Sequence, residues 1–336
     1  MRLGTDPGVT RVLIQKARAK SCRIVFPEGE NPTVLHACRV LVDEEIARPV
    51  LLGDAQKIRE RALGLRLDLG ALEIVDVETC PKLSTYADEL FRLRQRKGVT
   101  RTEASGLVRN CNTLGALMVQ LGDADALVTG LTTHYPDTIR PLLQVIPLRL
   151  DVQRASGLYL TITPRGKLYF LADCTVNIKP SSEDLAEIAI CAADTARRFD
   201  VEPRVALLSF SNFGSSRHES SDRVRKAVEI IHGRRPELLV DGEMQADTAL
   251  LPDRMEQTYP FSPLRGGANV LIFPSLDAGN IAYKLLAFLG GAQLIGPILM
   301  GLAKPVHVLQ RDSSVSDVVN LAALAAVEAQ ENLRST

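Results

Sequence analysis

The sequence predicts an α/β protein built from two three-layer domains. Three observations support this class: a length of 336 residues, an alternation of short apolar runs with longer amphipathic segments, and one break in that alternation near residue 150. A chain of this length is too long for one small hydrophobic core, so we expect two domains. Alternating strands and helices favour parallel sheets with helices on both faces.

Short apolar runs are the predicted strands. Each is rich in Val, Ile, Leu or Phe and bounded by turn-forming residues, as buried strands are. They cover residues 23–27, 49–53, 72–77, 126–129, 204–210 and 269–273.

Helical periodicity occupies the intervals between these runs. Residues 33–43 show it, and residues 181–184 (Ser-Ser-Glu-Asp) are an N-cap signal for a helix that reaches residue 198. Pro136 suits the first turn of a further helix. One amphipathic helix is predicted for residues 313–331.

Residues 151–173 break the alternation. Two strand-like segments flank Pro164-Arg165-Gly166, which predicts a β-hairpin and not a helical crossover. Because an antiparallel hairpin inside an α/β pattern often begins a new sheet, we expect the second domain to start there.

Composition narrows the classes of function. Lys plus Arg and Asp plus Glu each number 40, so the formal net charge is zero, whereas nucleic-acid binders usually carry a basic excess. Tryptophan is absent and aromatic residues are scarce, which disfavours stacking platforms for bases. No apolar stretch is long enough for a membrane span, and no signal peptide is visible. We therefore expect a cytoplasmic protein that binds neither nucleic acid nor membranes.

Cysteine and histidine spacing indicates no metal centre. The six cysteines are scattered and form no C-x-x-C pair, which is typical of buried free thiols in a reducing compartment. No histidine clusters with them as in a zinc site. His134, His218 and His307 are isolated, so hydrolase chemistry is not indicated either.

Four polar segments follow predicted strands, where α/β sheets bind their ligands. Residues 27–30 (Pro-Glu-Gly-Glu) fit an ordinary strand-to-helix turn. Residues 122–134 end in a Gly-Leu-Thr-Thr loop that contains Thr132, with Arg140 about one helical turn further on. This pattern suits a phosphate or a thioester carbonyl, although a plain surface arginine remains an equal alternative.

The other two segments lie in the second half of the chain. Residues 209–216, which include Ser211 and Asn212, resemble an anion cradle but lack the lysine of a nucleotide-triphosphate loop. The acidic stretch 241–247 is interpreted as a turn followed by a helix, with carboxylates that cap helices in preference to binding metal. Residues 296–311 include Lys304 and deliver Gln310 and Arg311 ahead of the last helix, whose first turn contains Asp317. Spacing alone also permits a capping aspartate and a surface arginine.

Together these segments resemble the phosphate acetyl/butyryltransferase family from about Arg23 to about Gln330. The matching phrases are FPEG, GDADALVTG, DGEMQAD, ANVLIFPSLDAGNIAYK and GPILMGLAKPV, Arg140-Pro141 with Gln144, and Gln310-Arg311 with Asp317. The resemblance implies two α/β domains, residues 1–150 plus 303–336 and residues 151–302, with a cleft between them. It implies reversible transfer of acetyl between coenzyme A and phosphate, and a usually dimeric protein.

The resemblance also assigns roles to residues. Asp317 would deprotonate the thiol of coenzyme A, whose ordinary pKa of about 8.5 leaves little thiolate at neutral pH. Arg140 and Arg311 would converge across the interdomain gap on a small acylated or phosphorylated metabolite and stabilise its developing oxyanion. The remaining ligand-binding positions expected on this basis are Arg94, Thr132, Ser211, Asn212 and Lys304.

The chain departs from the family pattern in two places. Gln310-Arg311-Asp312 stands where active members resemble Ser-Arg-Gly, and Phe288 stands where many have an arginine. Glutamine can donate a hydrogen bond but is bulkier, and losing one well-aimed donor typically costs on the order of 100- to 1,000-fold in rate. If transfer activity has been lost in this chain, Gln310, Arg311 and Asp317 would be vestigial catalytic positions.

Four sequence segments are similar to the C-terminal phosphotransacetylase-like domain of bacterial hybrid NADP-dependent malic enzymes. They are SFSNFGS, DGEMQAD, YPFSPLRGGANVLIFPSLDAGNIAYKLL and KPVHVLQR. That resemblance implies a regulatory domain that binds acetyl-CoA as an allosteric effector, with a malic enzyme domain as partner and no permanently bound cofactor or metal. An active phosphate acetyltransferase is the alternative, and a metal-dependent dehydrogenase of the isocitrate type is a weaker third hypothesis.

Overall fold

The computed structural model describes residues 8–70 and 72–334. The chain divides into two compact units. Unit 1 consists of the residues up to Pro147 together with those from Leu302 onward, and unit 2 is the continuous segment Leu148–Gly301.

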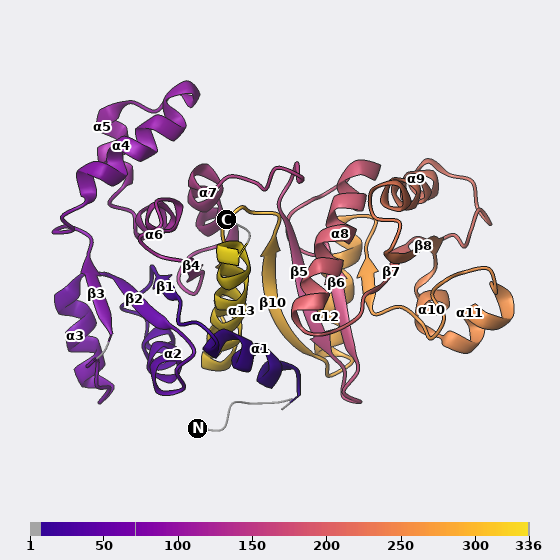
Figure 1. The fold of residues 1–336 in the computed structure, drawn as a ribbon, viewed down its shortest axis with the longest axis horizontal. Helices are drawn as coiled ribbons and strands as arrows, with labels where there is room; N and C mark the ends of the chain where they lie inside the picture. Colours follow the sequence, from indigo (N-terminus) through magenta and orange to yellow (C-terminus); the bar gives the residue numbers. More distant parts are fainter. Residues whose placement is uncertain (1–7, 71, 335–336) are drawn as a thin grey trace. The chain divides into compact units, whose positions relative to one another are not determined.

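Unit 1 is built on a five-stranded parallel sheet with the order β11-β4-β1-β2-β3 (Figure 1). Its inner strands are almost entirely apolar because helices cover both faces. The strands are β1 (Arg23–Phe26), β2 (Arg48–Gly53), β3 (Glu73–Asp76), β4 (Ala126–Thr129) and β11 (Val306–Val308).

Two helical layers enclose this sheet. Residues of α4, α6 and α7 share a core with Val25, Leu127 and Val308, whereas α1 and α2 pack against α13, which also contacts β1 and β4. The α4–α5 hairpin extends away from the sheet (Figure 1). The helices are α1 (Val9–Arg18), α2 (Pro32–Asp43), α3 (Ala55–Gly64), α4 (Leu83–Arg94), the 3₁₀ turn η1 (Gln95–Lys97), α5 (Arg101–Leu107), α6 (Cys111–Gln120), α7 (Tyr135–Val145) and α13 (Val315–Arg334).

The strand order of unit 1 reverses at β1. The chain proceeds from β1 to β2 and β3 in one direction, and β4 with β11 lies on the other side of β1. In open α/β sheets, ligands bind at such a switch point, beyond the carboxyl ends of the strands. The segments that follow β1, β4 and β11 all emerge at this edge.

Unit 2 has a six-stranded mixed sheet with the order β10-β5-β6-β9-β7-β8. Strand β5 pairs antiparallel with both β6 and β10, and the other pairs are parallel. The strands are β5 (Ser156–Ile162), β6 (Leu168–Ala172), β7 (Arg204–Leu208), β8 (Leu239–Met244), β9 (Val270–Ile272) and β10 (Gln293–Met300).

The helices of unit 2 also form two layers. On one face α8 contacts β6, β7 and β9, and α9 packs beside it. On the other face the ring of Tyr283 in α12 stacks on Tyr159 of β5, with centroids 4.2 Å apart. The helices are α8 (Ser182–Arg198), α9 (Glu219–Arg234), α10 (Ala246–Leu250), α11 (Pro252–Thr258) and α12 (Leu276–Phe288).

The α/β class is confirmed, and so is the hairpin: β5 and β6 pair antiparallel around a turn at residues 163–167. The predicted strands end within two residues of the observed ones. The interpretation of residues 241–247 as a turn followed by a helix was wrong for Asp241–Met244, which belong to β8. Gly242 allows this because its backbone approaches Leu207 so closely that a Cβ would lie 2.6 Å from the carbonyl oxygen.

Strand β10 was not predicted. Its apolar run is interrupted by Gly296-Pro297, a dipeptide that is typical of turns. In the structure these two residues form an irregularity in the pairing with β5, and the strand continues beyond them. Within the described ranges, no helix combines the length and apolar character that crossing a bilayer requires.

Candidate ligand-binding site in unit 1

The carboxylate of Glu28 organises the switch point of unit 1. Glu28 follows β1 and accepts four hydrogen bonds from the loop after β4. The backbone N–H groups of Gly130 and Leu131 reach Oε2 at 2.8 Å, and the N–H and hydroxyl of Thr132 reach Oε1 at 2.7 and 2.5 Å. The loop after β4 is therefore fixed by the residue that follows β1.

The same loop abuts the end of β11. The N–H of Leu309 donates to the carbonyl of Thr129 at 2.6 Å. Gly130 has φ +121°, and a Cβ there would lie 2.5 Å from the carbonyl oxygen of Leu309. This close approach requires glycine and places the Thr132 loop beside the Gln310 turn.

A hollow of about 420 Å³ opens beside Glu28. Its walls combine the loop after β4, represented by Thr132 and Thr133, with the residue that caps α2 and the first residues of α6. The partial positive charge of a helix N-terminus favours anionic ligands, whereas the carboxylates of Glu28 and Glu30, which also line the hollow, oppose them. Asn31 and Asn110 cap these two helices and also line the hollow.

Arg140 and Arg311 both belong to unit 1. Arg140 lies in α7, which begins directly after the Thr132 loop, and Arg311 lies in the turn after β11. Both side chains are exposed. Among residues 8–70 and 72–334, none forms a hydrogen bond or ion pair with either guanidinium group. Their positive charge is therefore available to an anion.

Two further cations predicted as ligand contacts also belong to this unit. Arg94 ends α4, and its Nε is buried without a hydrogen-bond partner in the described part of the chain. A buried donor without a partner is costly, so a ligand or water that accepts from it would be stabilised. Lys304 lies half-buried in the segment that leads into β11. Ligand binding by these two residues stays a prediction.

Asp317 takes part in a capping box at the start of α13. The N–H and hydroxyl of Ser314 donate to its Oδ2 at 2.8 and 2.7 Å, and the N–H of Asp317 returns a bond to the Ser314 hydroxyl at 3.3 Å. The capping alternative left open by the sequence is thus present. The role of Asp317 as a base stays a prediction. Gln310, exposed in the preceding turn, is tied to Ser313 through its backbone N–H and carbonyl groups.

Ser211 and Asn212 lie in unit 2, in the loop after β7, and both are buried. The hydroxyl of Ser211 donates to Glu243 at 2.9 Å and accepts from the N–H of Ser216 at 3.0 Å. The amide of Asn212 exchanges two bonds with Gln245. These groups hold their own loop, and their role as ligand contacts remains untested.

Glu243 is the centre of that network. It is fully buried and accepts from the N–H of Gly214 at 2.7 Å and from Arg225 at 3.1 and 3.2 Å. Burial opposes ionisation, but the bonds from Gly214 and Arg225 outweigh it and hold the pKa of the Glu243 carboxyl below its ordinary value. This carboxylate is therefore charged at neutral pH and already satisfied by the protein.

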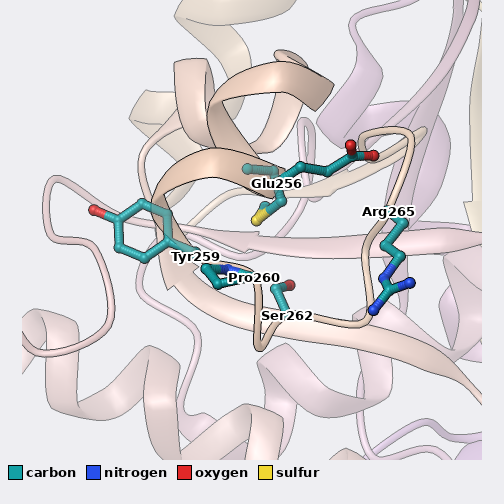
Figure 2. Close-up of a pocket in the computed structure, with 6 residues that line it drawn as sticks. Glu256, Tyr259, Pro260, Ser262 and Arg265 are labelled. Carbon is teal, nitrogen blue, oxygen red and sulfur yellow. The ribbon is translucent and has the colours of Figure 1, made fainter.

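Unit 2 also has a smaller hollow of about 250 Å³ next to α11 (Figure 2). Tyr259 and Arg265 lie on opposite sides of it, with Glu256 above. The ring of Tyr259 packs against Phe213, with centroids 4.9 Å apart. No residue predicted as part of the site lines this hollow.

Most of the cysteines are buried thiols. All six are free, and Cys22, Cys38, Cys174 and Cys191 are buried. Burial raises the pKa of Cys22 and of Cys191 to about 11, so both are neutral thiols at pH 7. Within the described ranges, no three His, Cys, Asp or Glu side chains are grouped as metal ligands would be.

Sequence reasoning missed Glu28 and Glu243. Glu28 was assigned to an ordinary turn because its partners lie about 100 residues later in the chain, beyond any local pattern. The pairing of Glu243 with Arg225 likewise depends on the return of the chain through α9. Both carboxylates lie close to the carboxyl end of a strand, Glu28 two residues beyond β1 and Glu243 one residue before the end of β8, and this position is the signal that could have raised both candidates.

The chain is similar to known proteins over almost its whole length. The family model for phosphate acetyl/butaryl transferase matches residues 9–326. An NADP-dependent malic enzyme of Escherichia coli is 43% identical over 323 residues, which is 95% of this chain and 42% of that protein. A phosphate acetyltransferase of Bacillus subtilis is 41% identical over 316 residues, 94% of this chain and 97% of that protein. The chain thus spans less than half the length of the malic enzyme it matches.

Solved structures agree with the sequence comparison. A phosphotransacetylase from Streptococcus pyogenes superposes with a TM-score of 0.93 at 36% identity, covering 98% of this chain and 100% of that one. A phosphotransacetylase from Staphylococcus aureus gives a TM-score of 0.89 at 37% identity, covering 96% and 98%.

Replacing Glu243 by glutamine should destabilise unit 2. Glu243→Gln puts an amide NH2 group among the donors of Ser211, Gly214 and Arg225, and an unsatisfied buried polar group typically costs about 1–3 kcal/mol in the free energy of unfolding. Urea unfolding at pH 7 measures this loss. Glu237→Gln is the matched control, because Glu237 forms an exposed pair with Arg235 and its loss should change the free energy of unfolding far less.

The stability difference between wild type and Glu243→Gln should also depend on pH. The Glu243 pKa is lower in the folded than in the unfolded protein, so the stabilisation is complete above the unfolded value of about 4.3 and is lost as pH falls through the folded value. The stability difference between wild type and Glu243→Gln should therefore shrink on acidification. A difference that stays constant between neutral pH and about pH 3 would contradict this assignment.

Proposed function

The chain belongs to the phosphate acetyl/butaryl transferase family, and from this premise we propose that it binds acetyl-CoA in unit 1 without transferring the acetyl group. In this proposal it acts as the regulatory part of a hybrid NADP-dependent malic enzyme, where acetyl-CoA is an allosteric effector of malate decarboxylation. The malic enzyme domain of the same polypeptide would be its partner.

Unneutralised positive charge supports anion binding. Arg140 and Arg311 emerge from neighbouring segments at the switch-point edge, and neither is paired within the described residues. The phosphates of coenzyme A are strong acceptors for guanidinium groups, which bind them in bidentate fashion. A ligand held there would lie near the hollow beside Glu28, which is lined by helix N-termini.

The proposed loss of transfer activity depends on Gln310-Arg311-Asp312, which stands where the resemblance implies Ser-Arg-Gly in active members. Gln310 and Asp312 are both exposed in the turn that presents Arg311. Asp312 adds a negative charge beside the cation that would stabilise an oxyanion, and like charges disfavour that transition state.

An active phosphate acetyltransferase is the second candidate. The chain is 41% identical to the Bacillus subtilis phosphate acetyltransferase over 97% of that enzyme's length, and 43% identical to the malic enzyme. This near-equal identity supports the active enzyme as the second candidate. In that case Asp317 would take the thiol proton, and Arg140 and Arg311 would bind phosphate and the thioester carbonyl. Both hydrogen bonds from Ser314 reach Oδ2 of Asp317, so the proton would be taken by Oδ1.

We also propose that the chain forms a homodimer or a larger assembly. An apolar seam on α12 supports this: Ile281, Leu285, Phe288 and Leu289 follow the i, i+4, i+7, i+8 spacing of a helix-packing face, yet all are exposed. Ile178 extends the seam, because its carbonyl accepts from the N–H of Leu276 at the start of α12.

The size of this seam suits a dimer contact. The five side chains are 51–86% exposed. At roughly 150–200 Å² for a fully exposed large side chain, they offer on the order of 600 Å². This approaches the area of about 800 Å² that each partner contributes to a standard interface. A two-fold axis near Leu285 would pair two copies of α12 antiparallel.

Acetyl-CoA should bind without turnover. Calorimetric titration measures binding, and release of free thiol from acetyl-CoA in the presence of phosphate measures transfer. Arg311→Ala should weaken binding by about tenfold or more, because it removes a charge-assisted hydrogen bond. Arg165→Ala, in the exposed hairpin turn of unit 2, is the matched control and should bind as wild type does. Turnover of about ten per second or faster by the wild type would overturn the proposal in favour of the enzyme.

Restoring the family motif should restore some transfer. The double variant Gln310→Ser/Asp312→Gly returns a small hydroxyl donor and removes the nearby negative charge. We expect its rate of coenzyme A acetylation by acetyl phosphate to exceed that of wild type by at least about tenfold, part of the effect of one well-aimed donor. Equal rates in the two proteins would show that this turn does not limit the chemistry.

The α12 seam should determine the oligomeric state. Light scattering after size exclusion should give the wild type at least twice the chain mass of 36.7 kDa, and Phe288→Glu should give the monomer mass with an unchanged circular dichroism spectrum. Leu63→Glu, at a 78% exposed position of α3, is the control and should leave the mass unchanged. An oligomer that survives Phe288→Glu would place the contact elsewhere.

A further inference from the structure

The loop Gly130–Thr133 has the geometry of an anion-binding nest. Three successive backbone N–H groups, of Gly130, Leu131 and Thr132, converge on one carboxylate at 2.7–2.8 Å. Consecutive N–H groups arranged in this way form concavities that bind phosphate or carboxylate ions. Here the anion is internal, since it is the side chain of Glu28.

The nest is linked to α7 through two adjacent threonines, each of which makes its own side-chain hydrogen bond. The hydroxyl of Thr132 also donates to Glu28, and the next residue, Thr133, bonds through its hydroxyl to that of Thr138 at 2.5 Å. Thr138 is fully buried in α7 and donates back to the carbonyl of His134, which precedes the helix. Arg140 is two residues beyond Thr138.

We propose that Glu28 is a positioning residue: it fills the nest as an internal anion and so orders the Thr132–Thr133 loop and the first turn of α7. This fixes the start of the helix that carries Arg140 in its second turn. The inference rests on the proposed binding of acetyl-CoA and adds to it a residue that does not itself touch the ligand. Because the nest is occupied, the phosphates of the ligand would be bound by the arginines and not by these N–H groups.

Removing the internal anion and supplying an external one tests this assignment. Glu28→Ala leaves the three N–H groups without an acceptor and opens a space that formate can enter. We expect it to weaken acetyl-CoA binding by about tenfold or more, a coupling typical of residues in one hydrogen-bond network. Added formate should then recover most of the affinity, as measured by calorimetric titration. Chloride at equal ionic strength controls for salt screening.

Amide hydrogen exchange provides a readout that needs no ligand. In Glu28→Ala and Glu28→Gln, the peptide covering residues 130–138 should exchange faster, and formate should slow that exchange in the alanine variant only. Glu60→Ala is the matched control: Glu60 is an exposed carboxylate of α3 that accepts a bond from the Gln56 side chain at 2.8 Å. It should change neither the affinity nor the exchange of this peptide.

The outcomes separate this inference from the proposed function. If the wild type does not bind acetyl-CoA but Glu28→Ala exchanges faster and formate reverses it, Glu28 orders the loop and the proposed ligand is wrong. If the wild type binds acetyl-CoA and Glu28→Ala binds it equally well, the positioning role is overturned. An affinity loss without formate rescue and without faster exchange at 130–138 would overturn it as well, because the loss would then arise outside the nest.

Discussion

The pairing of β11 with β4 is the contact on which the candidate site depends. The chain leaves unit 1 after Pro147, builds all of unit 2, and returns at Leu302 to add the last strand to the first sheet. Only this return brings Arg311 and Asp317 to the edge where the loop after β4 carries Thr132 and leads to Arg140. The glycine at position 130 makes the join close, since no side chain fits between it and Leu309.

The arginines of unit 1 differ in whether an acidic side chain neutralises them. Many of its arginines form surface pairs, such as Arg23 with Glu73 and Arg101 with Asp88, and pairs of this kind contribute little stability individually. Arg140 and Arg311 have no such partners in the described ranges, so their charge is not cancelled locally. A chain with zero net charge can in this way still present a positive region to a phosphorylated ligand.

The sequence was most informative where local rules apply. Residues 126–129 were predicted as a strand with the observed bounds, and Ser181 caps α8 as its pattern indicated. It was least informative where a polar residue is stabilised by distant partners. Glu243 sits in β8 only because Arg225, Ser211 and Gly214 satisfy it, and Glu28 acquires its role from a loop that lies far along the chain. The family resemblance predicts roles for Arg140, Arg311 and Asp317, which stay predictions, and the structure adds which segments carry these residues.

The order of the segments along the chain also affects biosynthesis. Unit 2 is contiguous, so all of its strands are synthesised before β11 and α13. Until those residues emerge, β4 is a bare edge strand, and the apolar faces that α13 later covers on α1 and α2 remain in water. The sheet of unit 1 therefore stays incomplete until the whole of unit 2 has been synthesised, and during this interval its uncovered edge and apolar helix faces are exposed to self-association.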